Sequence, residues 1–176
     1  MSIKAATNAD LPGILEVHRL AFGSPIEAGL VRDLLADPSA APRLSLIAKQ
    51  TGQIIGHILF TRISVGDTDA KASILCPLAV LPDHQSNGAG STLIDAGLQR
   101  LRNEGCYLVF VLGDPAYYGR FGFQPAALDR FPTPQPIPDQ YRAGWMVHNL
   151  SDQPLETGQG RLSCADALNK PKYWSD

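Results

Sequence analysis

One short segment of the chain has the residue types and spacing of a loop that holds phosphate groups. Its residues are Gln85, Ser86, Asn87, Gly88, Ala89, Gly90 and Ser91. It follows an apolar run at 74–80 and precedes an amphipathic pattern typical of a long helix. The N–H groups of such a loop and the positive end of the helix dipole attract anions. The segment predicts a site for a phosphate-bearing ligand, although a simple turn before a helix has the same composition.

The spacing of this segment excludes two common phosphate-binding motifs. The Walker motif needs a lysine directly after its second glycine, and none follows Gly90. The dinucleotide fingerprint needs a third glycine at the position that Leu93 occupies.

A second motif follows the apolar run 107–112, which reads as a buried strand. It contains Tyr118, Gly122 and Phe123 in the pattern Tyr-x-x-x-Gly-Phe. Together with the pattern Gln-x-x-Gly-x-Gly after a strand ending in Leu-Ala-Val, it resembles the signatures of the GNAT N-acetyltransferases. The resemblance covers roughly residues 3 to 125.

The resemblance implies acetyl-CoA as acyl donor, no metal, and direct transfer of the acetyl group to a primary amine. The loop amides would hold the pyrophosphate, and the splayed end of the preceding strand would bind the pantetheine arm. The residues expected to bind the cofactor are Leu78, Ala79, Val80, Gln85, Ser86, Asn87, Gly88, Ala89, Gly90 and Ser91. Pro77 removes one ladder donor, which is consistent with local disruption of that strand.

Tyr118 is the candidate general acid, because a phenol with a pKa of about 10 stays protonated at neutral pH. The alternative is an aromatic side chain that only packs. No acidic residue lies on the strand before the glycine loop, only Cys76. His57 is a candidate base because imidazole titrates in a suitable range, although a core histidine fits the same pattern. His18 lies on an apolar helix face and is expected to be structural.

The chain departs from the family pattern at Val111, where many members have an asparagine that contacts the cofactor. The segment Gly113, Asp114 and Pro115 is expected to shorten the last helix, with Asp114 as its cap. Tyr117 is expected to pack or to touch the cofactor, and Arg120 to be a solvated surface residue.

The order of elements predicts an α/β (α+β) fold, a mixed central sheet flanked by helices in the order β-α-α-β-β-β-α-β-α-β. Strands are expected at 3–6, 44–49, 54–65, 107–112 and 145–150, and a further strand containing the run 74–80 is expected to end at Val80. Helices are expected from Thr7, from Ser24 and after Gly88, the second with a capping box completed by Glu27. A single domain should span 1–176, with a core at about 3–125 and a C-terminal strand and tail at 126–176. The tail most simply covers the sheet; shaping the acceptor pocket or contacting a second subunit are the alternatives.

The composition is that of a globular protein with one core, at 176 residues, 44% hydrophobic residues and a mean hydropathy of -0.06. A net charge of -2 without a basic run predicts neither nucleic acid nor membrane as partner. The three widely spaced cysteines favour reduced thiols in a cytoplasmic protein. A small-molecule or protein amine is the expected acceptor, and a homodimer is possible. A non-catalytic acyl-CoA-binding module on the same fold and a nucleotide-binding protein are the rival interpretations.

Overall fold

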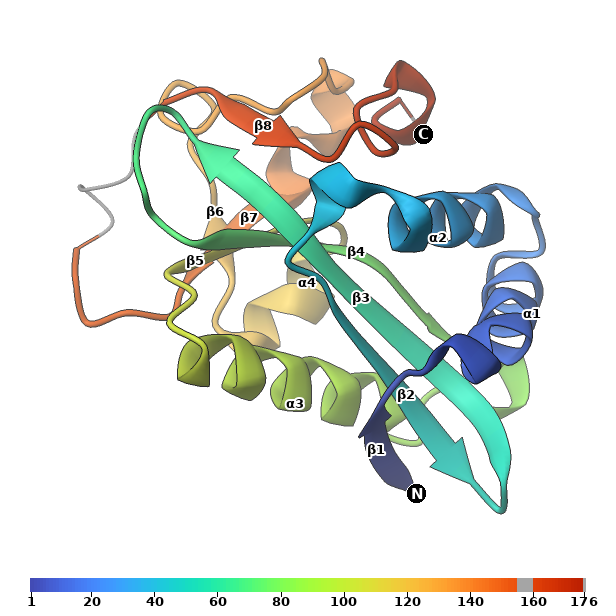
Figure 1. The fold of residues 1–176 in the computed structure, drawn as a ribbon. Coiled ribbons are helices and arrows are strands. Elements are labelled where there is room, and N and C mark those ends of the chain that lie inside the picture. Colours follow the sequence, from blue (N-terminus) through green and yellow to red (C-terminus); the bar gives the residue numbers. More distant parts are fainter. Residues whose placement is uncertain (155–159, 176) are drawn as a thin grey trace.

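The computed structural model describes residues 1–154 and 160–175, and its centre is one mixed β-sheet (Figure 1). In spatial order the strands are β1 (Ser2–Ala5), β2 (Leu44–Gln50), β3 (Gln53–Val65), β4 (Ala72–Val80), β5 (Leu108–Leu112), β7 (Trp145–Asn149) and β6 (Gln124–Pro125). A further strand, β8 (Leu162–Cys164), pairs with the far end of β3. The β4–β5 pair is parallel and the other pairs are antiparallel. The expected fold class and order of elements are confirmed.

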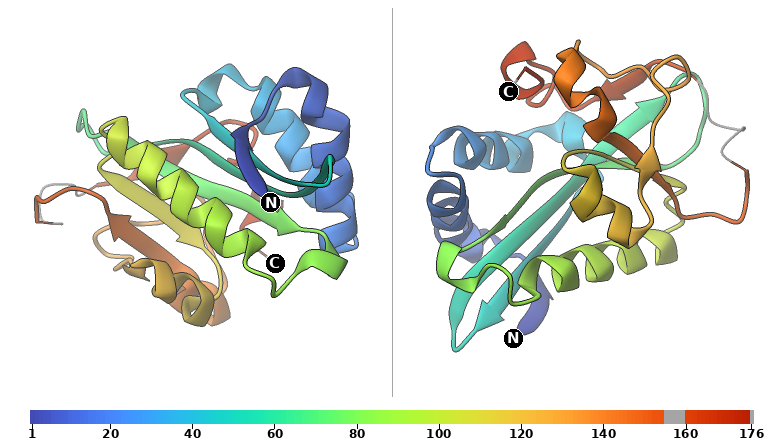
Figure 2. Two further views of the ribbon diagram at one scale, coloured as in Figure 1. Left: turned by 90° about the horizontal axis from the view of Figure 1, so that it is seen from below. Right: turned by 180° about the vertical axis from the view of Figure 1, so that it is seen from behind.

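Helices cover both faces of the sheet (Figure 2). The α-helices are α1 (Leu11–Phe22), α2 (Ile26–Ala36), α3 (Ala89–Asn103) and α4 (Pro115–Tyr118). Short 3-10 helices are η1 (Asn8–Asp10), η2 (Pro38–Ala40), η3 (Pro82–His84), η4 (Gly119–Phe121), η5 (Asp139–Gly144) and η7 (Pro171–Tyr173). Helices α1 and α2 lie on one face, and α3 lies on the other. Within the described residues, no helix is long and apolar enough to cross a membrane.

The core divides into two apolar layers because side chains of a strand alternate between the faces of the sheet. On β3, Ile58 and Phe60 pack in the layer beneath α3, whereas Leu59 and Ile63 pack in the layer beneath α2. Leu30 and Leu34 are the α2 residues of that second layer. The alternation fixes which side chains of β3 and β4 can reach a ligand on either face.

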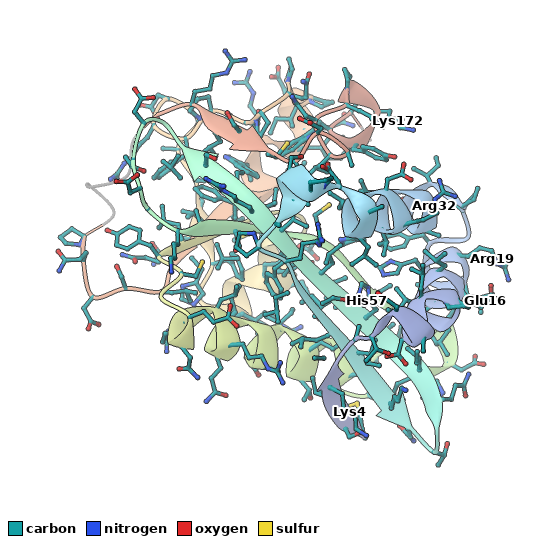
Figure 3. All side chains as sticks on the ribbon, in the orientation of Figure 1. Lys4, Glu16, Arg19, Arg32, His57 and Lys172 are labelled. Atoms are coloured by element: carbon teal, nitrogen blue, oxygen red, sulfur yellow. The ribbon has the colours of Figure 1, made fainter. Side chains whose placement is uncertain are left out.

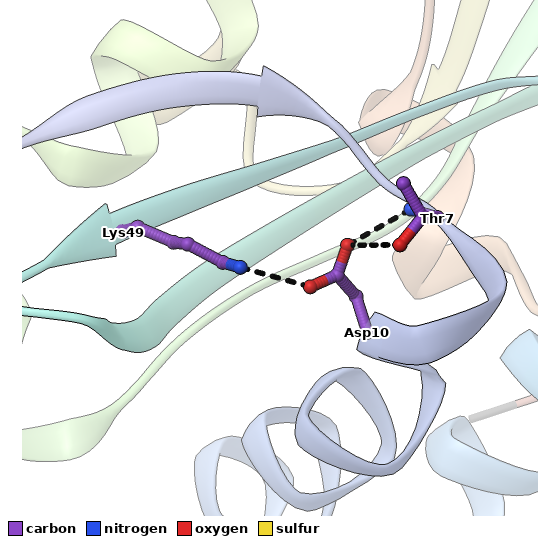
Figure 4. A network of polar contacts seen from close by, with 3 residues as sticks. All are labelled: Thr7, Asp10 and Lys49. Carbon is purple, nitrogen blue, oxygen red and sulfur yellow. Dashed lines mark hydrogen bonds and ion pairs between the residues drawn. The ribbon is translucent and has the colours of Figure 1, made fainter.

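A small polar network holds the start of α1 against the sheet (Figure 4). The Asp10 carboxylate accepts hydrogen bonds from the Thr7 N–H and hydroxyl, both at 2.9 Å. Lys49 on β2 donates to the same carboxylate at 2.9 Å, which lowers the pKa of Asp10 to about 2. The predicted helix start at Thr7 therefore takes the form of η1, after which α1 begins at Leu11.

The capping box predicted for α2 does not form. The Ser24 hydroxyl accepts a hydrogen bond from the Ile26 N–H at 3.1 Å, but the helix begins one residue later than predicted. In the part of the chain that the structure describes, Glu27 returns no bond to Ser24, and its Oε2 atom is buried without a partner. The sequence pattern was right about the helix and wrong about the role of Glu27.

The C-terminal segment covers the α2 face of the sheet. Trp174 is 2% exposed, packs edge-on against Trp145 and donates to the Leu168 carbonyl at 2.9 Å. Strand β8 had not been predicted, whereas the proline-rich segment 131–138 has neither helix nor strand, as expected. Residues 155–159 and 176 of the predicted tail lie outside the described residues.

Candidate functional site

A gap opens between β4 and β5 halfway along the sheet. The two strands pair only from Ala72↔Leu108 to Ile74↔Phe110, while β4 continues to Val80. On its other side, β4 stays paired with β3 up to Val80, with an extra residue inserted between Leu75 and Leu78. That bulge contains Pro77, which has no N–H to donate. The second half of β4 therefore presents unpaired backbone groups toward the gap.

The glycine loop lies at the end of this strand and leads into α3. Ser86 and Gly88 have positive φ angles of 61° and 85°, so the chain turns sharply before the helix begins at Ala89. A Cβ atom at Gly88 would meet nothing within 4 Å, whereas at Gly90 it would lie 2.6 Å from the Tyr117 hydroxyl. Gly88 is needed for its backbone conformation, and Gly90 for the close approach of Tyr117.

A cavity of about 670 Å³ extends over the loop and the unpaired part of β4. It is lined by Leu78, Val80, Gln85, Ser86, Gly88, Gly90, Ser91, Tyr117 and Arg120. Three residues predicted to bind the cofactor do not line it. Ala79 and Ala89 are buried in the core, and Asn87 is exposed outside the cavity lining.

Tyr117 and Arg120 bring polar chemistry to this cavity from the short α4–η4 segment. The Arg120 guanidinium carbon lies 4.8 Å from the centroid of the Tyr117 ring, and its Nε donates to the Tyr117 carbonyl at 3.3 Å. Arg120 is exposed, as predicted, but it also lines the cavity. Tyr117 and Arg120 are three positions apart in a helical segment, and this spacing is the sequence signal that could have placed both side chains on one face. A fixed cation and loop amides fit a phosphate-bearing ligand.

Tyr118 lies behind Tyr117 and does not line the cavity itself. Its ring packs edge-on against Tyr117 and Phe123, with ring centroids 5.1 Å and 5.7 Å away, and a Cβ at Gly113 would collide with it. Burial raises the pKa of Tyr118 well above that of free tyrosine, and Tyr117 and Cys76 raise it further. Its hydroxyl makes no hydrogen bond within the described part of the chain and keeps its proton at neutral pH.

Cys76 lies in the bulge of β4, between paired residues Leu75 and Leu78. Its side chain packs against the apolar layer of α2. Burial raises the pKa of its thiol to about 12, with smaller contributions from Cys164 and Glu27. The thiol is therefore neutral, and it lies within electrostatic range of the Tyr118 phenol and the Glu27 carboxylate.

His57 lies in the protein interior beside α1, away from the cavity, whereas Glu16 and Arg19 lie on the outer side of that helix (Figure 3). Its Nδ1 is hydrogen-bonded to His18 Nε2 at 2.8 Å, and its Nε2 to the Ser45 hydroxyl at 2.9 Å. Burial lowers the pKa of His57 well below its usual value, and lowers that of His18 to about 4. These contacts fit a structural pair of neutral imidazoles, and the role of base remains a prediction.

The expected departure from the family pattern has a visible consequence. Val111 is 1% exposed and lies inside β5, opposite Met146 of β7. Helix α4 has a single turn, capped by the Asp114 carboxylate, which accepts from the Ala116 N–H at 2.9 Å. Of the residues of this helix, Tyr117 lines the cavity.

Two further cavities lie outside the glycine loop. One of about 440 Å³ is at the opposite end of β3 and has the charged residues Arg43, Arg62, Asp69, Lys71 and Glu104 in its lining. Another, of about 410 Å³, lies beyond the ends of β5 and β7. Gly113, which packs against Tyr118, lines the second of these.

Comparisons with known proteins place this fold and site in one family. Residues 11–123 match the model of the Acetyltransferase (GNAT) family. The uncharacterized N-acetyltransferase YjhQ of Escherichia coli K12 is 48% identical over 161 residues, which cover 90% of this chain and 88% of that protein. The uncharacterized N-acetyltransferase YhbS of the same strain is 33% identical over 171 residues, covering 97% and 99%. The chain therefore belongs to the GNAT acetyltransferase family.

Solved structures of relatives contain coenzyme A or its acetyl thioester. The crystal structure of YhbS from Escherichia coli in complex with CoA superposes with a TM-score of 0.86 at 33% identity, covering 96% of this chain and 92% of that one. A GNAT acetyltransferase from Brucella melitensis in complex with acetyl-CoA gives a TM-score of 0.75 at 30% identity, covering 95% and 97%. These ligands agree with the chemistry of the glycine loop.

Proposed function

We propose that this chain is an acetyl-CoA-dependent N-acetyltransferase that transfers the acetyl group directly to a primary amine. One observation carries the proposal: the cavity joins the glycine loop to the unpaired edge of β4. A phosphate-bearing head and an extended amide-containing arm are what such a surface would hold. The coenzyme A complexes of the relatives support the same ligand.

When bound, acetyl-CoA would supply an acyl group activated as a thioester. Loop amides, the start of α3 and Arg120 would hold its phosphates. Unpaired N–H and C=O groups of Leu78 and Val80 would bind the arm as a neighbouring strand does. A backbone N–H in the gap would polarise the acetyl carbonyl, because a fixed donor stabilises negative charge that develops on the oxygen. Ala79 and the loop residues Asn87 and Ala89 would then contribute through backbone shape.

Tyr118 would provide the proton that the departing sulfur needs. Its raised pKa keeps the phenol protonated. It also makes the phenol a weaker acid than an ordinary thiol, whose pKa is about 8.5. The phenol would therefore stabilise the forming thiolate mainly by a hydrogen bond, and complete transfer would follow as the nitrogen loses its proton.

The first experiment is release of free thiol from acetyl-CoA in the presence of a panel of primary amines. We expect release that depends on the amine and saturates with its concentration. The variant Tyr118→Phe should lower kcat by about 10²-fold or more with unchanged affinity for CoA, which is the usual contribution of a general acid. The variant Tyr107→Phe changes a tyrosine on the far side of the core and serves as control.

A non-catalytic acyl-CoA-binding module is the second candidate function. The neutral, buried state of His57 favours it over a mechanism that uses His57 as base. Tight binding of CoA without thiol release for any amine or peptide N-terminus would support that module. Protection by ATP or NAD instead of CoA would argue for a nucleotide-binding protein.

The remaining properties that we propose concern the setting of the reaction. A single domain would act in the cytoplasm, with Cys76, Cys106 and Cys164 as free thiols. The acceptor would be a small-molecule amine or a protein amine, with no nucleic acid, membrane or metal involved. A homodimer is compatible with the exposed apolar side chains Leu20, Phe22 and Ile26.

A further inference from the structure

Glu27 is a buried acidic group that the structure leaves without a partner. Its Oε2 atom is shielded from solvent and makes no hydrogen bond with any residue that the structure describes. An isolated carboxylate is costly to bury, because the protein must replace the hydration that the charge loses. A native structure that keeps such a group usually uses it, and the role expected from sequence, a capping box with Ser24, is not formed.

The position of Glu27 follows from the buried face of α2. Leu30, Val31 and Leu34 are at most 4% exposed and form the stripe that packs on the sheet. Glu27 precedes Leu30 and Val31 by three and four residues, so it extends this stripe at the N-terminal end. The carboxylate is thus turned toward the sheet, while the residue as a whole is only part-buried and stays reachable.

The stretch of sheet near this carboxylate is the bulge of β4. Cys76, in the bulge, packs against the same apolar layer as Leu30 and Leu34. Burial is the main cause of the raised pKa of the Cys76 thiol, and the charge of Glu27 contributes a smaller part, after Cys164. Burial is likewise the main cause of the raised pKa of Tyr118, with smaller parts from Tyr117 and Cys76. Glu27 extends the stripe of α2 that packs on this layer, whereas Tyr118 packs against the layer beneath α3, so the two residues belong to opposite faces of the sheet.

We propose that the carboxylate of Glu27 binds the ammonium group of the acceptor and takes one proton from it. The inference rests on the proposed function and names a substrate class, an amine that is cationic at neutral pH. No acidic residue lies on β4, so this carboxylate supplies from α2 the negative charge that the strand lacks.

The protons and bonds balance in this scheme. One proton passes from the ammonium nitrogen to Glu27, and the freed lone pair forms the C–N bond as the C–S bond breaks. The nitrogen loses a second proton as the amide forms, and that proton replaces the one that Tyr118 gives to the sulfur. Glu27 then releases its proton to solvent, and the products are an amide and a free thiol.

The test measures amine binding rather than turnover, so it is independent of the proposed transfer. Three proteins are saturated with CoA: wild type, Glu27→Gln and the control Asp33→Asn. The control changes a part-exposed carboxylate on the same helix that is paired with Arg32. Calorimetry then follows two probes, benzylamine, which is cationic at pH 7, and aniline, which is neutral there. We expect Glu27→Gln to weaken benzylamine binding at least 10-fold and to leave the binding of aniline and of CoA unchanged. Asp33→Asn should bind all three compounds as wild type does.

Two results would overturn the inference. One is benzylamine binding that is equal in wild type and Glu27→Gln, or absent in wild type. The other is a lower urea midpoint for Glu27→Gln than for Asp33→Asn, which would make Glu27 a structural anchor. Removing an unpartnered charge should instead leave the midpoint equal or higher. If wild type releases no thiol but still binds benzylamine more tightly than Glu27→Gln does, the proposed transfer is rejected and the cation site is kept.

Discussion

At the scale of single residues, buried polar groups separate the structural positions from the functional ones. His18 and His57 are both fully buried and are hydrogen-bonded to each other, although His18 Nδ1 has no partner within the described residues. Glu27 has none. Arg120 is exposed and yet belongs to the cavity. Burial alone therefore does not identify the site. A missing partner does not identify it alone either, because His18 Nδ1, Thr61 Oγ1 and two nitrogens of Arg130 are also buried without one. Glu27 differs from these groups in being a carboxylate.

The histidine pair makes a prediction about acid sensitivity. The pKa of His18 falls from 6.5 to about 4 in the folded protein, chiefly through burial. Because the folded pKa is the lower one, the neutral imidazole stabilises the fold above pH 6.5, and this stability is lost as the pH falls toward 4. The loss is at most about 1.4 kcal/mol per pH unit for one histidine.

The variant His18→Gln removes this titration and keeps a side chain that can bond to His57. Urea unfolding between pH 7.5 and pH 4.5 should show a shallower decline for the variant than for wild type. The smaller decline that remains belongs to His57 and His148, whose pKa values are also lowered by burial. Parallel declines in the two proteins would show that His18 does not titrate on unfolding.

Sequence could predict the glycine loop and Tyr118 because their spacing is local. It could not predict the role of Glu27, because Ser24, Pro25 and Glu27 have the spacing of a capping box whether or not the carboxylate turns back. The direction of that side chain is set by α2 packing on the sheet. His57 was a candidate base by residue type, and the sequence could not predict its contacts with His18 and Ser45, which join residues distant in the chain.

At the scale of elements, the gap between β4 and β5 depends on strand length and on one bulge. Strand β5 is short and turns into α4 at Gly113, while Pro77 interrupts the regular ladder of β4. Both features can be seen in the sequence: Pro77 marks the interruption of β4, and Gly113, Asp114 and Pro115 mark the end of β5. Strand β8 was not predictable, because three residues in a polar tail have little pattern of their own. It forms because β3 extends to Val65 and offers a partner there.

The packing of α3 on β3 gives a prediction with a matched control. A Cβ atom at Gly97 would collide with the Phe60 ring, whereas at Gly29 in α2 it would meet nothing within 4 Å. Gly97→Ala should therefore lower the free energy of unfolding by about 1–3 kcal/mol through overpacking. Gly29→Ala should raise it by about 0.5–1 kcal/mol, because alanine favours the helix.

Denaturant unfolding of the two variants against wild type measures both effects. Opposite signs for two identical substitutions in helices would show that close packing, rather than helix propensity, governs α3. Equal stabilisation by both substitutions would mean that α3 and β3 can separate without cost.

At the scale of the whole molecule, the sheet separates two layers of helices, and the proposed function assigns the acetyl donor to one side and the acceptor to the other. One side contains α3, the glycine loop and the α4–η4 segment that carries Tyr117 and Tyr118. The other side contains α1, α2 and the C-terminal tail. The gap between β4 and β5 is the place where the sheet is open between the two sides. The chain belongs to the GNAT family, and under the proposal for Glu27 the acceptor would be selected on the α1–α2 side.

The fold could be predicted furthest where a local motif coincides with regular alternation, from the first strand to Phe123. The C-terminal third was less predictable because its structure depends on contacts distant in sequence. Trp174 packs on Trp145, and β8 pairs with β3, and neither pairing leaves a periodic signal.

The most direct test of the account follows an isotopic label from the acetyl group of acetyl-CoA. The enzyme is incubated with labelled acetyl-CoA and each amine of the panel, and products are identified by mass spectrometry. We expect one labelled amide for each CoA released, with both products reduced in parallel by Tyr118→Phe. Label recovered as free acetate, or retained on CoA with every amine and peptide acceptor, would contradict direct transfer.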